Sequence, residues 1–273
     1  MAIQAEIDRA NSAFWDEMCG SVLARKLGID DDSQASLRKF DHWYMGYYPY
    51  LSDFIPFGRL AGKRVLEVGL GYGTVSQKLV EAGAVYHGLD IASGPVALVN
   101  KRIRDIGASD SATQGSILAQ PYPEGSFDWV IAIGCLHHTG DLALAISRVH
   151  EFLKDGGEAM IMVYHAASYR QWRDAPFRTL ARRLANPATY SARRAGDERE
   201  RAQYDTNTAG VAAPQTEYVT KAELAYLCRS FAACEITATN IDSEKPFTGV
   251  PRETAIRRYG RWLGLDLYCH LRK

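Results

Sequence analysis

The chain lacks the features that would assign its 273 residues to a specialised class of protein. Its 32 lysines and arginines balance 32 aspartates and glutamates, so no bulk field draws it to nucleic acid or an anionic membrane. No apolar signal core follows Met1, and no apolar run approaches the roughly 20 residues that span a bilayer. The five scattered cysteines, such as Cys19 and Cys135, form no Cys-x-x-Cys pair. We therefore expect reduced thiols, a cytoplasmic location and no membrane partner.

A regular alternation of apolar runs and helix-like segments begins at Arg64. Strands are expected at 64–68, 85–90, 111–117, 127–133 and 159–164, separated by helices at 74–82, 94–106 and 141–153. A helix at 221–231, a strand at 234–241, a short helix at 253–262 and a strand at 265–271 follow. The alternation predicts right-handed crossovers and a parallel sheet covered on both faces, and the two late strands predict an antiparallel edge. The expected fold class is α/β, a Rossmann-like, doubly wound and mostly parallel seven-stranded sheet.

Two segments lie outside this alternation. Residues 1–60 are mostly helical and rich in aromatics, and they predict an N-terminal helical cap. Residues 166–217 contain helix-like and turn-rich stretches without a convincing strand, which indicates a helical insertion or lid after the fifth strand. The Rossmann-like domain is then expected to comprise residues 61–165 and 218–273.

A glycine-rich turn follows the first strand, in Glu67-Val-Gly69-Leu-Gly71-Tyr-Gly73-Thr74. Alternate glycines let the backbone turn sharply and lie against a ligand, and the next helix presents its N-terminus to that ligand. Thr74 replaces the third glycine of a dinucleotide fingerprint, and the Gly-Lys-Ser/Thr of a P-loop is absent, so the turn lacks a pyrophosphate cradle. Asp90 ends the second strand about 20 residues later, where a carboxylate can accept both hydroxyls of a ribose. Either feature alone could be a generic turn, but together they predict a cofactor site.

These residues resemble the class I S-adenosylmethionine-dependent methyltransferases of the small-molecule type, from about Arg64 to Tyr164. The glycine turn is similar to their first motif and Asp90 to the acid of their second. The segments 127–131 and 152–157 are similar to the fourth-strand motif and to the turn before the fifth strand, with Asp155 in place of a proline. The resemblance implies S-adenosylmethionine as the cofactor. Its implied binding residues are Glu67, Gly69, Gly71, Gly73, Asp90, Ile91, Ser116, Ile117 and Ile133.

The resemblance also implies a role for each part of this set. Asp90 would hold the ribose, the glycine turn would face the methionine part, and Glu67 would act on the methionine amine directly or through water. The acid that usually contacts the adenine amine is missing from Gly115-Ser116-Ile117. Adenine contacts are therefore expected from backbone groups and apolar neighbours.

Histidines gather where a general base for methyl transfer would lie. The fourth strand ends in Gly134-Cys-Leu-His137-His138-Thr139, beside the expected position of the methyl group, and His165 ends the fifth strand. Histidine suits this role because its pKa lies near neutral pH. The alternative is that one of the pair packs against the cofactor while the other helps to start the next helix. No metal site is expected from these histidines and Asp141, since adjacent side chains point in different directions.

Five tyrosines are expected near the acceptor. Three lie in the aromatic run 40–50, one ends the fifth strand and one precedes the helix that the capping box of Thr220 and Glu223 opens: Tyr44, Tyr47, Tyr48, Tyr164 and Tyr218. Aromatic rings over the site could exclude water and face a sulfonium, although most of the run is expected to be the core of the cap.

Three functions remain open from the sequence. The first is methyl transfer to an oxygen, nitrogen or carbon atom of a small-molecule acceptor in a biosynthetic pathway. The second is an RNA or protein methyltransferase that docks through residues 170–201, which hold nine arginines, no lysine and four acids. Nucleic acid is disfavoured because Ile133-Gly-Cys-Leu136 replaces the Asn/Asp-Pro-Pro-Tyr/Phe signature. The third is a non-catalytic module that binds the cofactor. A homodimer through the insertion also stays open.

Overall fold

The computed structural model describes residues 2–18, 21–29, 31–109, 111–191 and 196–273, so Cys19, Arg193 and Arg194 lie outside the described residues. The strands are β1 (Arg64–Val68), β2 (Val85–Asp90), β3 (Ala112–Gln114), β4 (Phe127–Ile133), β5 (Leu153–Tyr164), β6 (Ala233–Thr239) and β7 (Asp266–Arg272). The longer helices are α1 (Ala2–Met18), α3 (Gln34–Tyr47), α5 (Thr74–Glu81), α6 (Ser93–Asp105), α7 (Leu142–Phe152), α9 (Pro176–Leu184) and α12 (Arg252–Leu263). The shorter ones are α2 (Ser21–Lys26), α4 (Leu51–Phe54), α8 (Tyr169–Asp174), α10 (Glu198–Ala202), α11 (Lys221–Leu227) and the 3₁₀ turns η1 (Phe57–Arg59), η2 (Ile117–Ala119), η3 (Leu136–His138) and η4 (Pro187–Thr189).

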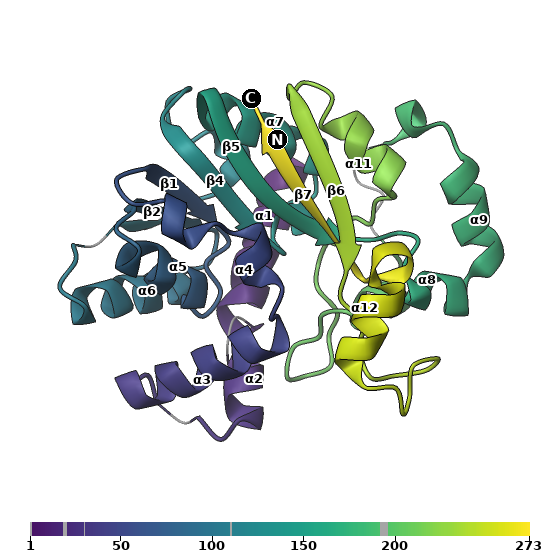
Figure 1. Ribbon diagram of the computed structural model, residues 1–273, viewed down its shortest axis with the longest axis horizontal. Helices are drawn as coiled ribbons and strands as arrows, with labels where there is room; N and C mark the ends of the chain where they lie inside the picture. Colours follow the sequence, from purple (N-terminus) through teal and green to yellow (C-terminus); the bar gives the residue numbers. More distant parts are fainter. Residues whose placement is uncertain (1, 19–20, 30, 110, 192–195) are drawn as a thin grey trace.

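All seven strands form one sheet in the order β3-β2-β1-β4-β5-β7-β6 (Figure 1). The first five pair in parallel, whereas β7 runs antiparallel to both β5 and β6. This confirms the expected α/β class, the seven strands and the antiparallel C-terminal edge.

Helices cover both faces of the sheet, as parallel strands require. Apolar side chains of α7 and α11, among them Ile146 and Leu224, pack on one face against β4 and β5. Those of α4, α5 and α6, among them Leu51 and Leu79, pack on the other face against β1 and β2. The core therefore lies in two layers on either side of the central strands.

Three element boundaries differ from the expectation by three residues or more. β3 has only three residues, because Ile117 turns into η2 and buries its side chain instead of extending the strand. β5 begins at Leu153, directly after α7, and its first residues pair with Phe127 across an irregularity in β4. α11 ends at Leu227 rather than near Phe231, whose ring still packs into the core from the following turn.

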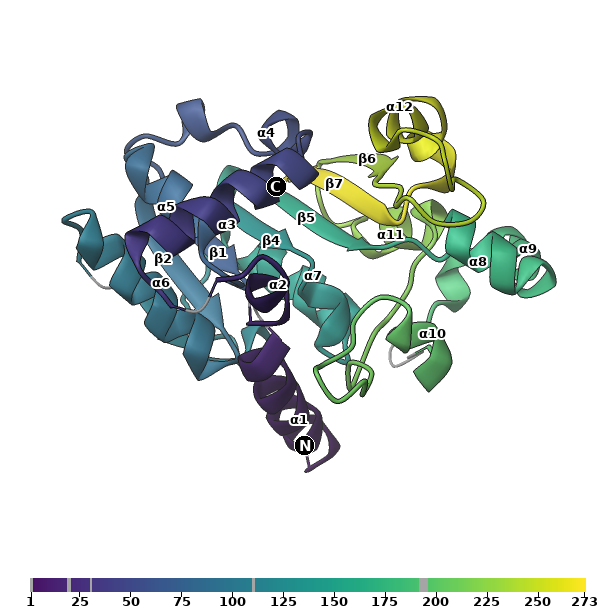
Figure 2. The same cartoon turned by 90° about the horizontal axis from the view of Figure 1, so that it is seen from below.

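The segments outside the alternation gather near the carboxyl ends of the parallel strands. Helices α2 and α3 lie below the sheet in Figure 1 and in front of it in Figure 2, whereas α1 passes behind the sheet in Figure 1. The segment after β5 carries α8, α9 and α10, and α9 reaches the far edge of the molecule in both views. Phe177 and Leu184 of α9 are exposed, at 87% and 76%. We propose that the N-terminal helices form the cap and that the segment after β5 forms the insertion, with the remaining residues as the Rossmann-like domain.

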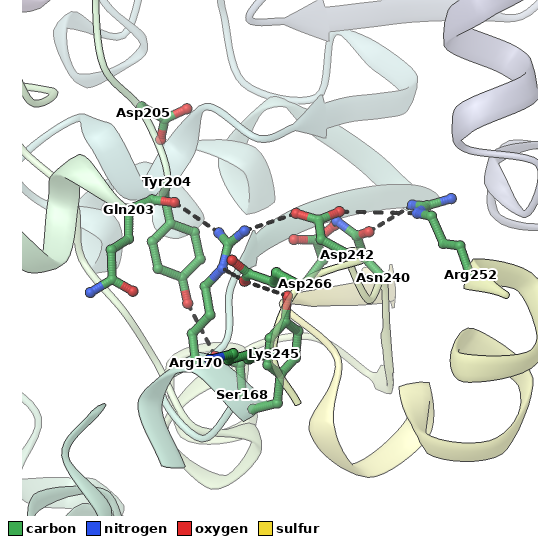
Figure 3. Close-up of polar contacts among 12 residues, drawn as sticks. Ser168, Arg170, Gln203, Tyr204, Asp205, Asn240, Asp242, Lys245, Arg252 and Asp266 are labelled. Atoms are coloured by element: carbon green, nitrogen blue, oxygen red, sulfur yellow. Dashed lines mark hydrogen bonds and ion pairs between the residues drawn. The ribbon is translucent and has the colours of Figure 1, made fainter. Parts of the chain in front are cut away.

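A partly buried polar network joins the added segments to one another (Figure 3). Arg170 of α8 forms ion pairs with Asp242, at 2.8 Å, and with Glu244 in the loop after β6. Its guanidinium also lies 4.8 Å from the ring centroid of Tyr204. From α12, Arg252 donates to Asn240 and to the carbonyl of Tyr47 in α3. The cap, the insertion and the C-terminal segment are thus fastened together beside the ends of β5 and β7.

None of the described helices is long and apolar enough to cross a membrane.

Candidate active site

A cavity opens where β1, β2 and β4 end, between these strands and helix α1. Its wall consists of Asp8, Asn11, Trp15, Val68, Gly69, Gly71, Leu89, Asp90, Ile91, Gly115, Ser116, Ile117, Ile133, Gly134, Cys135, Leu136, His138 and Thr139. Seven of the nine expected cofactor residues line it, and Glu67 and Gly73 do not. Among the described residues the wall contains no lysine or arginine, so no cationic side chain there would pair with a pyrophosphate.

Position 69 requires glycine because of a close contact within the protein as well as because of its place in the cavity wall. Its φ is +77°, and a Cβ there would lie 2.4 Å from Cβ of Cys135. The Cys135 thiol donates to the carbonyl of Val68 at 3.0 Å, which holds that side chain over the turn. Gly71 also has a left-handed φ, of +52°, but its Cβ position is open. The close approach at Gly69 therefore joins β1 to the loop after β4.

Substituting Gly69→Ala is expected to destabilise the protein by about 3 kcal/mol, the sum of a left-handed alanine and a steric clash. Gly71→Ala is the matched control, because it carries the same backbone cost without the clash and should lose only about 1 kcal/mol. The measurement is urea unfolding of both variants and of Gly69→Ala/Cys135→Gly. The double variant should recover about 1–2 kcal/mol of the clash. Equal losses at Gly69 and Gly71 would contradict this account.

Asp90 closes the second strand with both carboxylate oxygens already bound to backbone. One oxygen accepts from N–H of Leu70, at 2.7 Å, and the other from N–H of Ala92, at 2.9 Å. The side chain is buried, and burial raises the pKa of its carboxyl, although the two N–H groups act against this shift. Each carboxylate oxygen can accept more than one hydrogen bond, so Asp90 can also receive hydroxyl donors from the cavity. The residue fixes the glycine turn while facing a ligand.

Glu67 points away from the cavity into the core. One of its oxygens accepts from the hydroxyls of Ser76, at 2.6 Å, and Tyr86, at 2.8 Å. Burial raises the pKa of its carboxyl to about 7, despite these two hydrogen bonds. The structure therefore gives Glu67 a role in holding β1 to β2 and α5, and any contact with a ligand amine would have to be indirect.

The raised pKa of Glu67 predicts a pH-dependent difference between the wild type and Glu67→Gln. Glutamine can still accept both hydroxyls but carries no charge. The carboxyl has an unfolded pKa of 4.5 and a folded pKa of about 7, so its contribution to stability is intact below pH 4.5 and is lost as pH rises through 7. Glu67→Gln should thus match the wild type near pH 4.5 and exceed it by about 3 kcal/mol at pH 8.5. Urea unfolding across this range provides the measurement, and a constant difference would contradict the prediction.

The two adjacent histidines have different surroundings. His138 lines the cavity and packs against Trp15, with the rings tilted and their centroids 4.6 Å apart. Its Nδ1 lies 2.7 Å from the carbonyl of Gln215, which assigns the proton to Nδ1 and leaves Nε2 as a buried lone pair. His137 faces away from the cavity, and neither of its ring nitrogens has a partner among the described residues. Of the two histidines, only His138 lines the cavity.

Asp205, from the segment after α10, lies next to this basic nitrogen. Its carboxylate is 3.7 Å from Nε2 of His138 and accepts the hydroxyl of Tyr164 at 3.0 Å. Burial lowers the pKa of His138, and the charge of Asp205 partly restores it. His138 is therefore neutral at physiological pH and able to accept a proton, and Asp205 is placed to stabilise the resulting cation.

The third histidine candidate lies elsewhere. His165 pairs with Val219 and contacts the carbonyl of Gly264 through Nδ1, at 3.0 Å, and it does not line the cavity. Burial lowers its pKa to about 4. Within the described part of the chain, the histidines and Asp141 form no group of three converging metal ligands.

None of the five tyrosine candidates lines the cavity. Tyr44 and Tyr48 pack against the apolar layer beside β1, and Tyr47 donates its hydroxyl to Asp242 in the polar network. Tyr164 comes nearest, because its ring lies 4.2 Å from that of His137 and its hydroxyl meets Asp205. Tyr218 is buried behind it, with its hydroxyl 3.3 Å from the carbonyl of Glu200.

Sequence reasoning missed the contribution of helix α1. Asp8, Asn11 and Trp15 all line the cavity, and Asn11 donates to the carbonyl of His138 at 2.6 Å. Their spacing of three and four residues places them on one face of a helix, which is the signal that could have identified them. Asp205 had no comparable signal, because only the folding of the insertion brings it to His138.

The chain matches a known family over its central third. Residues 65–157 match the family model described as a methyltransferase domain. A ubiquinone biosynthesis O-methyltransferase of Pseudomonas aeruginosa is 31% identical over 105 residues, which are 37% of this chain and 44% of that protein. The corresponding protein of Azotobacter vinelandii is 34% identical over 102 residues, with the same coverage. The match thus spans less than half the length of these curated relatives.

Solved structures share the fold at low sequence identity. An S-adenosylmethionine-dependent methyltransferase of Mesorhizobium loti superposes with a TM-score of 0.53 and 19% identity over 83% of this chain and 97% of its own. A Haemonchus contortus phosphoethanolamine N-methyltransferase, solved with phosphomonomethylethanolamine and S-adenosylhomocysteine, gives a TM-score of 0.54 and 15% identity over 84% of this chain and 52% of its own. These likenesses concern the fold.

Proposed function

We propose that the chain is a class I S-adenosylmethionine-dependent methyltransferase that methylates a small molecule with a histidine as general base, and the match of residues 65–157 to a methyltransferase domain supports this proposal. One observation carries the proposal. The cavity has Asp90 on its wall, the base His138 also on its wall, and no cationic side chain among its lining residues. That charge pattern suits a cofactor that bears a ribose and a sulfonium cation.

The lining residues fit S-adenosylmethionine in a definite direction. Asp90 would accept the ribose hydroxyls, and Ser116 and Ile117 would border the adenine. The turn at Gly69 and Gly71 would lie against the methionine part, with Asp8 of α1 opposite. When bound, the cofactor supplies an electrophilic methyl group.

Proton removal from the acceptor is the chemical role that remains for the protein. Nε2 of His138 is a lone pair in a neutral, buried imidazole, so it can take a proton from an acceptor hydroxyl or ammonium. Asp205, 3.7 Å away, would stabilise the imidazolium that forms, and Tyr164 orients Asp205 through its hydroxyl. In this arrangement His138 is the base, and Asp205 and Tyr164 are positioning residues.

One observation favours a compact acceptor. The polar network closes the side of the molecule at the end of β5 with side chains from the cap, the insertion and the C-terminal segment. The five tyrosines would then act from behind the site, as its supporting wall.

The RNA or protein methyltransferase is the second candidate, and the arginine-rich insertion is its basis. Several of these arginines are engaged within the protein, which leaves less charge for a polyanion. Arg170 binds Asp242, Arg178 binds Glu200 at 3.1 Å, and Arg182 lies 3.4 Å from Glu223. These internal ion pairs support the small-molecule acceptor.

The proposed function is tested by acceptor-dependent transfer of a labelled methyl group. The protein and methyl-labelled S-adenosylmethionine are incubated together with an acceptor. Separate reactions contain a panel of small phenols and amines, bulk RNA or bulk protein. Both acceptor atoms belong in the panel, because the curated relatives are named as O-methyltransferases and one structural neighbour as an N-methyltransferase. We expect label only in a small molecule, with a gain of one methyl group by mass spectrometry. Label confined to RNA or protein would establish the second candidate instead.

A further inference from the structure

Three cysteine sulfurs meet at the open edge of the sheet, away from the cofactor cavity. Cys228 caps the end of α11, Cys234 lies at the start of β6 and Cys269 lies on the neighbouring strand β7. All three sulfur atoms lie within 4.8 Å of one another, and those of Cys234 and Cys269 are 3.4 Å apart. None of the three residues lines the cavity. We call this group the three-thiol cluster.

The cluster is enclosed on two sides and open on the third. Cys228 and Cys269 are fully buried against Leu224 and Phe231, whereas Cys234 is only partly buried. An ion could therefore enter past Cys234, and water could reach the same side. Among the described residues, no other group of three histidine, cysteine or acidic side chains converges in this way.

The three sulfurs lie in a largely apolar pocket, with Leu224 and Phe231 in the same layer of the core. Three converging sulfur ligands in such surroundings favour a soft cation over a hard one.

We propose that the three-thiol cluster binds one thiophilic divalent metal ion of the zinc class. Zinc binds thiolate sulfur at about 2.3 Å, which sets sulfur atoms of a tetrahedral site about 3.8 Å apart. The sulfur positions differ from that spacing by only about 1 Å, which side-chain rotation can absorb. The fourth position would face the open side of Cys234 and take a water molecule.

Metal binding is balanced by proton release. As the ion binds, each of the three thiols gives up its proton to solvent, and no electrons are transferred. Three thiolates and one divalent ion leave a single net negative charge. A pocket with a solvent-facing side tolerates this charge better than it would tolerate a higher charge. The ion would link α11, β6 and β7, so it would brace the antiparallel edge of the sheet.

The test is titration of the reduced, metal-free full chain with zinc, followed by calorimetry and native mass spectrometry. We expect one zinc per chain, release of protons and a rise in melting temperature. Cobalt, used as an optical probe for the same site, should give the charge-transfer absorption of cobalt bound to thiolate. Cys234→Ser and Cys269→Ser should each weaken zinc binding by at least about 100-fold.

Cys135→Ser is the matched control for these variants, because it removes a thiol outside the cluster and should leave the zinc affinity unchanged. Zinc binding that survives Cys234→Ser, or cobalt binding without the thiolate absorption, would overturn the proposal. So would the absence of stoichiometric binding by the reduced wild type. The wild-type cobalt spectrum keeps the test decisive even if a serine variant folds poorly.

Discussion

Substituting Asp90→Ala is expected to weaken binding of S-adenosylmethionine by at least about 100-fold, or more than about 3 kcal/mol. Two effects add. A charged acceptor for the ribose hydroxyls is lost, and such hydrogen bonds contribute about 1.5–3 kcal/mol each. The N–H groups of Leu70 and Ala92 also lose their partners, so the glycine turn is no longer held in its binding conformation. Calorimetric titration of the variant with S-adenosylmethionine measures the change.

Asp128→Ala separates loss of the ligand contact from general destabilisation. Asp128 is also an acid on a central strand, and it accepts the N–H of Arg64 at 2.8 Å and pairs with Lys154. It lies at the opposite end of its strand from the cavity and does not line it. The control should lose stability but bind the cofactor normally. Comparable weakening of cofactor binding in both variants would mean that Asp90 acts through stability alone.

Substituting His138→Asn is expected to lower kcat by about 10²–10⁴-fold while changing cofactor affinity little. Asparagine can still donate to the carbonyl of Gln215, but it removes the basic Nε2. The loss should therefore fall on proton removal rather than on folding or binding. The measurement is steady-state kinetics with the acceptor that the labelling experiment identifies, together with calorimetry of the cofactor.

His165→Asn serves as the control, because it removes a buried imidazole that also contacts a carbonyl but lies outside the cavity. Its kcat should stay close to that of the wild type. An equal fall in kcat for both histidine variants, or no fall for His138→Asn, would refute the assignment of the base.

The positioning role of Asp205 predicts a shift in the pH profile. The charge of Asp205 raises the pKa of His138, against the larger lowering effect of burial. In Asp205→Asn the pKa of His138 should fall further, so the acidic limb of kcat should move to lower pH while kcat itself declines. A decline in kcat with an unmoved acidic limb would indicate a purely structural contribution.

The sequence predicted the parts of the molecule that depend on local patterns. The spacing of apolar residues and the positions of turn residues predicted the first and last residues of β1, β2 and β4, because an apolar run between glycine turns leaves few alternative bounds for a strand. The same logic located Asp90, since the acid follows a buried strand at a fixed distance from the turn. Eight of the 18 residues that line the cavity, His138 among them, were therefore expected from the sequence.

The parts that depend on long-range packing were not predicted. Helix α1 closes the cavity with Asp8, Asn11 and Trp15, although nothing in their local sequence indicates where the helix docks. Asp205 reaches His138 across an insertion whose path is determined by the polar network around Arg170. Tyr44 and Tyr47 of α3 were expected near the acceptor, but Tyr44 packs in the apolar layer and Tyr47 joins the polar network, because a run of aromatics stabilises a cap as readily as it lines a pocket.

The central claim is that the cavity holds S-adenosylmethionine, and calorimetric titration of the wild-type protein tests it most directly. The account predicts one site per chain with micromolar affinity for S-adenosylmethionine. It also predicts no binding of NADH, because the turn lacks the third glycine of a dinucleotide fingerprint and no described residue of the cavity wall has a cationic side chain. Binding of NADH in place of S-adenosylmethionine, by protein shown to be folded, would contradict the account.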